Sequence, residues 1–128
     1  MPTLEAFLPQ GHDEARKAML IERLTEATVD SIGAPAESVR ILLSELPGAN
    51  FGIGGKSAAQ GAAPMLPVIV AILIAGRTDA QKEALIAALC ETAADVLDAP
   101  LQATRVMIKD VPNTDFGIGG KTARALGR

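Results

Sequence analysis

The chain contains the same segment twice. When the sequence is shifted by 65 residues, residues 2–63 align with residues 67–128 without a gap, and 22 of the 62 positions are identical. The longest shared block, Phe-Gly-Ile-Gly-Gly-Lys, occupies residues 51–56 and 116–121. Two copies are too few for a solenoid, because a stacked repeat array needs at least three units. The sequence therefore predicts one compact body made of two similar units, residues 1–63 and residues 67–128, with a linker over 57–66.

Each copy predicts a strand, a helix and a second strand. Short apolar runs rich in strand formers cover residues 2–8 and 67–74, and each is followed by a glycine. Residues 39–46 and 104–111 read as the second strands. Between them, leucines recur at helical spacing, at positions 20 and 24 in one copy and 85 and 89 in the other. Thr78 with Gln81 predicts a capping box at the start of the second helix.

These elements determine the expected fold. A helix between two strands implies a right-handed parallel crossover, so each copy is a βαβ unit. Two strands under one helix are marginally stable alone. Pairing the copies gives an α/β (α+β) fold, a four-stranded mixed sheet with both helices on one face. The other sheet face, also apolar, is expected to be covered by further chains.

Composition narrows the classes of partner. A net charge of −3 and a pI near 5.1, without any basic cluster, argue against nucleic acid and anionic membranes. The longest apolar run, residues 65–75, is too short to span a bilayer, and no signal peptide is evident. With one cysteine, Cys90, no intrachain disulfide can form, so a cytoplasmic location is expected. One histidine and one cysteine offer no metal site, and no cofactor is expected.

Several motifs occur together at consistent spacing. Pro2 follows Met1, Gly-x-Asp-Glu begins the first helical stretch, Ala-Pro precedes the second strand, Val39-Arg40 lies in it, and Phe-Gly-Ile-Gly-Gly follows. The set resembles the tautomerase superfamily, specifically the 4-oxalocrotonate tautomerase group in a fused, two-copy form, over nearly the whole chain. The resemblance implies a tautomerase (MIF-like) fold and a homotrimer that acts as a pseudo-hexamer.

The resemblance makes Pro2 the catalytic base, provided that Met1 is removed. The proline is then a free secondary amine that can accept a proton, whereas an amide nitrogen cannot. An ordinary α-amino group titrates near 7.7 to 8.0, and burial beside arginines lowers its pKa towards that of a useful base. Alternatively, Pro2 merely follows an initiator methionine. Pro67 aligns with Pro2, but its nitrogen is acylated, so one catalytic centre per chain is expected.

The resemblance also assigns substrate-binding residues. Arg40 and Arg105 occupy matching strand positions and would bind a substrate carboxylate and stabilise charge on the 2-oxygen. A surface ion pair is the alternative role. Arg77 would hold the far carboxylate, whereas the first copy has His12 in that place, either as a weaker ligand or merely as a helix-start residue.

Phe51 and Phe116 fall in the repeated glycine-rich block. According to the resemblance, these phenylalanines would line the pocket around the proline, although packing alone would also explain why phenylalanine occupies both positions.

The expected activity is a cofactor-independent 1,3-keto-enol tautomerisation of an unsaturated 2-hydroxy or 2-oxo acid. A dicarboxylate such as 2-hydroxymuconate, from aromatic catabolism, is the favoured substrate. A decarboxylase, dehalogenase or hydratase of the same superfamily is an alternative, and so is a non-catalytic binding or assembly protein. Related dehalogenases carry Glu where Ile53 and Ile118 stand here, which ranks that alternative lower.

Overall fold

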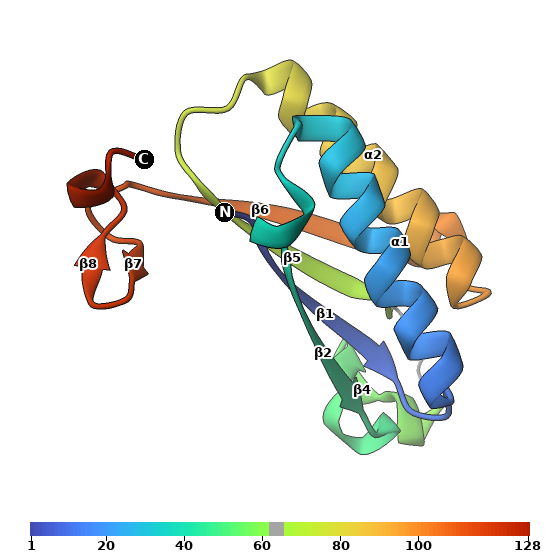
Figure 1. The fold of residues 1–128 in the computed structure, drawn as a ribbon. Helices are drawn as coiled ribbons and strands as arrows, with labels where there is room; N and C mark the ends of the chain where they lie inside the picture. The colour runs from blue at the N-terminus through green and yellow to red at the C-terminus, as the bar shows by residue number, and fades with distance from the viewer. Residues whose placement is uncertain (62–65) are drawn as a thin grey trace.

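The computed structural model describes residues 1–61 and 66–128, and it contains the strand, helix and strand expected of each copy (Figure 1). In the first copy these are β1 (Thr3–Pro9), α1 (Glu14–Ile32) and β2 (Arg40–Leu46); in the second they are β5 (Val68–Ile74), α2 (Asp79–Val96) and β6 (Arg105–Val111). A small hairpin follows each copy's last long strand: β3 (Gly52–Ile53) with β4 (Lys56–Ser57), and β7 (Gly117–Ile118) with β8 (Lys121–Thr122). Short 3₁₀ turns complete the chain at Ala36–Ser38, Gly48–Asn50, Ala58–Gln60, Leu101–Ala103 and Arg124–Leu126.

The four long strands form one mixed sheet in the order β2-β1-β5-β6. Within each copy the pairing is parallel, and the two copies meet through antiparallel β1 and β5. In that central pair Thr3 lies opposite Ile72 and Phe7 lies opposite Val68. The predicted mixed sheet is confirmed. β1 and β5 begin one residue later than expected, after Pro2 and Pro67, whose nitrogens carry no N–H for a ladder bond.

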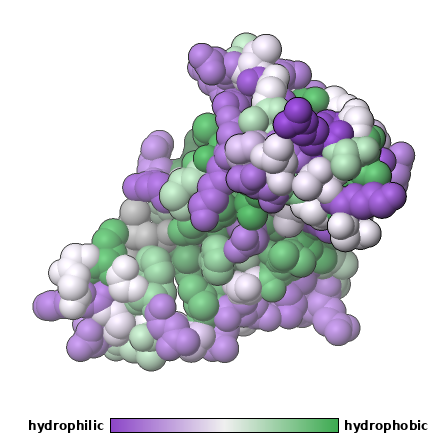
Figure 2. Space-filling view, turned by 90° about the vertical axis from the view of Figure 1, so that its left-hand side faces the viewer, coloured by the Kyte–Doolittle hydropathy of each residue, from purple (hydrophilic) through white to green (hydrophobic). Residues whose placement is uncertain are grey.

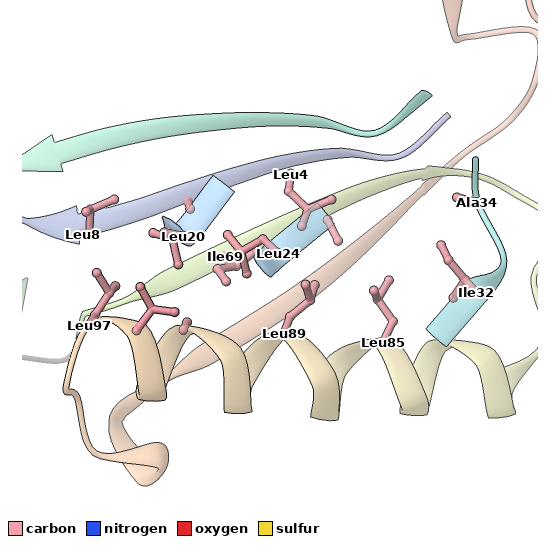
Figure 3. Close-up of a cluster of buried hydrophobic side chains, with 14 of the residues drawn as sticks. Leu4, Leu8, Leu20, Leu24, Ile32, Ala34, Ile69, Leu85, Leu89 and Leu97 are labelled. Carbon is pink, nitrogen blue, oxygen red and sulfur yellow. The ribbon is translucent and has the colours of Figure 1, made fainter. Parts of the chain in front are cut away.

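Both helices cover the same face of the sheet, as expected, and the core lies between these two layers (Figure 3). The four leucines singled out by their helical spacing all point into it and are at most 1% exposed: Leu20, Leu24, Leu85 and Leu89. Leu4, Leu8, Ile69 and Leu73 meet them from the sheet. Burying one such side chain contributes about 1.5 to 3 kcal/mol, so this layer holds the two copies together.

The helix ends follow from local sequence. Asp13 caps α1, because its side chain accepts a hydrogen bond from the N–H of Arg16 at 2.8 Å. The predicted capping box of Thr78 and Gln81 is present at the start of α2. α1 stops at Gly33, which adopts the left-handed conformation with φ of 69° that glycine tolerates best.

The sheet face turned away from the helices is apolar and uncovered in the single chain. Leu42 and Met107 on its outer strands are 55% and 50% exposed. Figure 2 views the molecule from this side and shows hydrophobic residues gathered below a more polar projecting part. Large exposed apolar patches of this kind mark sites of association.

The segment expected to be a linker, residues 57–66, begins with regular secondary structure. Ser57 ends β4, and a 3₁₀ turn follows at Ala58–Gln60, where Ser57 and Gln60 form a capping box. Sequence reasoning missed this turn because its small residues resemble a flexible connection. Residues 62–65 of that segment lie outside the described part of the chain.

Candidate active site

The strand register brings the start of the chain to the beginning of β2 and the end of β5. The main-chain N–H of Arg40 donates a hydrogen bond to the carbonyl of Pro2 at 3.0 Å. Because β1 and β5 are antiparallel, the segment after Ile74, which includes Arg77, lies at this same end of the sheet. Pro2 itself is less than 2% exposed. We call this group of residues around Met1 and Pro2 the N-terminal site.

Two hollows meet at the N-terminal site, and Met1 and Arg40 line both of them. The larger has a volume of about 510 Å³, and its lining is Met1, Pro35, Glu37, Ser38, Arg40 and Arg128. The smaller has a volume of about 290 Å³, and its lining is Met1, Thr3, Arg40, Phe116, Gly117, Ile118 and Gly119. The two hollows together offer space for a small molecule beside the chain's amino group.

The amino group at this site belongs to Met1, and its pKa lies below its ordinary value of 8.0. Partial burial is the main cause, and the positive charges of Arg77 and Arg128 lower this pKa further. All three effects disfavour the protonated amine. An amine on Pro2, which is buried more deeply than Met1, would experience the same kinds of effect.

Residues from both copies build the N-terminal site. Pro2 and Arg40 come from the first copy, whereas Arg77 and Phe116 come from the second. The β7–β8 hairpin follows β6 to the end of the sheet where the chain begins, and this places Phe116 in the smaller hollow (Figure 1). A comparison of the two copies in sequence could not predict that residues of both copies meet at one site. Their meeting depends on the antiparallel pairing of β1 with β5.

The other four residues named from the sequence lie at the opposite end of the sheet. There the N–H of Arg105 donates to the carbonyl of Pro67 at 3.1 Å. The β3–β4 hairpin, which follows Phe51, lies at this end too (Figure 1). His12 contributes its charge to the environment of Glu45, near the end of β2.

The two strand arginines make different contacts. Arg105 Nη1 donates to the carbonyls of Gln102 at 2.6 Å and Thr104 at 3.3 Å, which ties the side chain to its own main chain. The three ion pairs among residues 1–61 and 66–128 join Lys17 to Glu45, Arg23 to Asp95 and Lys82 to Asp110. Arg40 belongs to none of them. In the single chain, Arg40 is therefore the strand arginine that lines the hollows beside Met1.

Sequence reasoning missed Arg128 and Glu37, which line the larger hollow. Neither has an identical counterpart in the other copy, since they align with Ala63 and Gln102, so the repeat gives no signal for them. A third hollow, of about 560 Å³, lies between α1 and β2. Two of its three charged residues, Lys17 and Glu45, are paired with each other at 2.7 Å, and the third is Glu14.

The described part of the chain holds no group of three or more His, Cys, Asp or Glu residues able to bind a metal ion. None of the helices in that part is both long enough and apolar enough to cross a bilayer. Cys90 is half-buried, and burial raises the pKa of its thiol.

Comparison with known families reproduces the tandem organisation. The sequence model of the tautomerase enzyme family matches the chain twice, at residues 2–60 and at residues 67–125. The chain belongs to the tautomerase family. Each match covers one βαβ unit and the hairpin after it, so both copies of this tautomerase carry the family's sequence pattern.

Individual relatives agree with the family assignment. A 2-hydroxymuconate tautomerase of Stutzerimonas stutzeri is 44% identical over 63 residues, which are 49% of this chain and all of that protein. The crystal structure of a native fused 4-OT is 80% identical, with a TM-score of 0.95, over 98% of this chain and 99% of the other. A second fused 4-OT, described as an asymmetric trimer, is 74% identical with a TM-score of 0.92 over the same shares. The resemblance noted in the sequence and the tautomerase fold are thereby confirmed.

Proposed function

We propose that this tautomerase interconverts the enol and keto forms of unsaturated 2-hydroxy acids, with the amine of Pro2 as its general base. The observation that carries the proposal is the burial of Pro2, whose carbonyl accepts a hydrogen bond from Arg40, directly after Met1, whose surroundings include Arg77 and Phe116. Removal of Met1 would convert the Pro2 nitrogen from an acylated to a basic one. The amine would then lie in a partly desolvated, positively charged site.

The reaction needs one group that both accepts and returns a proton. The neutral Pro2 nitrogen would take the proton from the substrate's 2-hydroxyl, so the O–H bond breaks and negative charge spreads from the oxygen along the conjugated chain. The same nitrogen would then give the proton to a chain carbon, where a C–H bond forms as the double bonds shift. The product is the 2-oxo isomer, and no electrons enter or leave.

The arginines would make the enol easier to deprotonate. A guanidinium fork donates two coplanar hydrogen bonds to a carboxylate and favours the negative charge that develops on the 2-oxygen. Arg40 is suited to this role because it lines both hollows and takes part in no ion pair within the described residues. Arg77, on the second copy, would bind a more distant carboxylate. Phe116 would limit the access of water, which helps to keep the amine neutral.

A dicarboxylate such as 2-hydroxymuconate is the proposed substrate. Two observations support this choice. Arg77 and Arg128 both act on the amino group, yet only Arg128 lines the 510 Å³ hollow, and the relative from Stutzerimonas stutzeri is named for this substrate. His12, Phe51 and Arg105 would act at the N-terminal site only if a neighbouring chain presented them there.

We further propose a homotrimer of the asymmetric kind. The apolar open face of the sheet, with Leu42 and Met107 half-exposed, needs a cover, and a relative 74% identical is described as an asymmetric trimer. Arg40 and Arg105 lie on this same open face, in register with Thr3 and Val68. In such an assembly, both strand arginines would face a neighbouring chain.

The experiment compares the purified protein with Pro2→Ala and Pro67→Ala in a spectrophotometric assay of 2-hydroxymuconate. Intact mass establishes that Met1 is absent from all three proteins. Pro2→Ala should lower kcat by about 10²- to 10⁴-fold, the usual contribution of a positioned base. The kcat of Pro67→Ala should stay within about three-fold of that of the unmodified protein, because the nitrogen of Pro67 is an amide and cannot act as a base. Equal turnover by Pro2→Ala and the unmodified protein would refute the assignment.

A further inference from the structure

The side chain of Arg128 reaches into the N-terminal site. Its Nη1 donates to the sulfur of Met1 at 2.9 Å, and it lines the 510 Å³ hollow together with Arg40. Neither arginine belongs to any of the ion pairs found among the described residues. Glu37 is the carboxylate on the wall of this hollow, and it is not ion-paired to either of them. Two guanidinium groups thus line one hollow, and neither is engaged in an ion pair within the described residues.

Hydrogen bonds hold Arg128 in this position. The main-chain N–H of Arg128 donates to the carbonyl of Ala123 at 2.8 Å, and the side-chain amide of Asn113 donates to the main-chain oxygen of Arg128 at 3.0 Å. Gly127 turns the chain with a φ of 74°, in the left-handed region that suits glycine. Ala123, the other end of this segment, is fully buried. The main chain therefore directs Arg128 towards the beginning of the protein.

The first copy has no equivalent of this arrangement. Arg128 aligns with Ala63, and Asn113 aligns with Gly48. Both the cation and the amide that holds it are thus confined to the second copy. Arg128 and Asn113 lie at the end of the sheet where Pro2 is, and removal of Met1 can free the nitrogen of Pro2. The nitrogen of Pro67, at the other end of the sheet, always remains an amide.

We propose that Arg128 is a carboxylate-binding residue that acts together with Arg40 on the carboxylate next to the substrate's 2-oxygen. This inference rests on the proposed function and adds one residue to it. A thioether is a weak hydrogen-bond acceptor, so the sulfur of Met1 holds the guanidinium weakly. Once Met1 is removed, a carboxylate oxygen can take the place of that sulfur and form the stronger, charge-assisted bond.

The assignment to the carboxylate beside the 2-oxygen follows from the shared hollow. Arg128 lines the same space as Arg40, whereas Arg77 lines neither hollow and approaches the amine from the end of β5. Every 2-hydroxy or 2-oxo acid has this carboxylate, whether or not it has a second one. Arg128 should therefore contribute equally to the binding of monocarboxylates and dicarboxylates.

Calorimetric titration tests this with two unreactive ligands, sorbate and muconate, which have the same six-carbon diene with one and two carboxylates. Neither has a 2-hydroxyl, so binding is measured without turnover. Arg128→Ala should raise the Kd of both ligands by about 10- to 100-fold, the cost of losing one hydrogen bond to a charged group. Arg128→Lys should recover part of this loss, because it keeps the charge but not the fork.

Arg124→Ala is the matched control, since Arg124 lies on the same exposed segment and lines neither hollow. It should leave both Kd values within about two-fold, and thermal melting checks that every variant is folded. The inference is overturned if Arg128→Ala binds both ligands normally, if it loses affinity for muconate alone, or if the unmodified protein binds neither ligand. Failure of the unmodified protein to turn over 2-hydroxymuconate would instead count against the proposed function, and the binding result would stand.

Discussion

Arg40 donates its main-chain N–H to the carbonyl of Pro2 at 3.0 Å, and the same bond joins Arg105 to Pro67 at 3.1 Å. The two ends of the sheet are thus built alike around a proline and a strand arginine. They differ in what the other copy adds: Arg77 and Arg128 at the Pro2 end, and His12 near the Pro67 end. Duplication of one unit has given two ends with the same backbone and different charge.

Arg77→Ala should shift the pH profile of catalysis upwards. The charge of Arg77 lowers the pKa of the Met1 amino group, and we expect it to act in the same direction on the Pro2 amine once Met1 is removed, so that loss of this charge raises the pKa of the base. A general base must be neutral, and kcat/KM therefore increases as the pH rises through this pKa. The variant should lose more activity on the acidic side of the profile than on the basic side.

The pH dependence of kcat/KM for 2-hydroxymuconate measures this shift. His12→Ala, the matching position in the first copy, should leave the acidic limb of the profile unchanged. A profile for Arg77→Ala that is unmoved, or that moves to lower pH, would show that Arg77 does not act on the base.

Phe116→Ala should reduce kcat/KM by about ten-fold, equivalent to about 1.4 kcal/mol. Phe116 lines the hollow beside Met1 and Arg40, and its loss admits water to the amine and to the substrate. Phe51→Ala is the matched change at the other end of the sheet and should cost less than about three-fold. Steady-state kinetics of both variants decide the point, and a larger loss from Phe51→Ala would mean that a neighbouring chain supplies the wall.

Leu89→Ala should destabilise the fold by about 2 to 5 kcal/mol, the range for removing a fully buried leucine. Leu89 is completely buried between α2 and the sheet. Met19→Ala, on the outer surface of α1 where the side chain is 51% exposed, should change the free energy of unfolding by less than about 0.5 kcal/mol. Urea denaturation followed by circular dichroism compares the two, and similar values would contradict the two-layer core.

Leu42→Asp should weaken the proposed trimer. Its side chain lies on the open apolar face of the sheet, where a charge in a closed interface would be costly. Met19→Asp places the same charge on the helical side and should leave the assembly intact. Sedimentation velocity gives the mass of each species, and an undisturbed trimer for Leu42→Asp would exclude this face as the interface.

The fold could be predicted in some detail because its signals are local and repeated. The spacing of Leu20 and Leu24 defined the buried side of a helix, and the same spacing recurred 65 residues later. The membership of the N-terminal site could be predicted only in part. Whether Arg77 or His12 lies beside Pro2 depends on the antiparallel register of β1 with β5, which no local pattern encodes.

For a related reason, the sequence could not identify Arg128 as a residue of the N-terminal site. It lies 127 residues from Met1 in sequence, and it contacts that residue only because the β7–β8 hairpin returns the chain to the start of β1. The repeat, which revealed the other candidates, offers Ala63 at the matching position. A functional residue present in one copy alone leaves no trace in a comparison of the copies.

The most direct measurement is an NMR titration of the mature enzyme labelled with ¹⁵N at proline, combined with its intact mass. The account predicts a chain that begins at Pro2, with an amine pKa below the ordinary α-amino value of 8.0 and equal to the pKa seen in the acidic limb of kcat/KM. An active enzyme that retains Met1, or a Pro2 amine that titrates at or above 8.0, would contradict it.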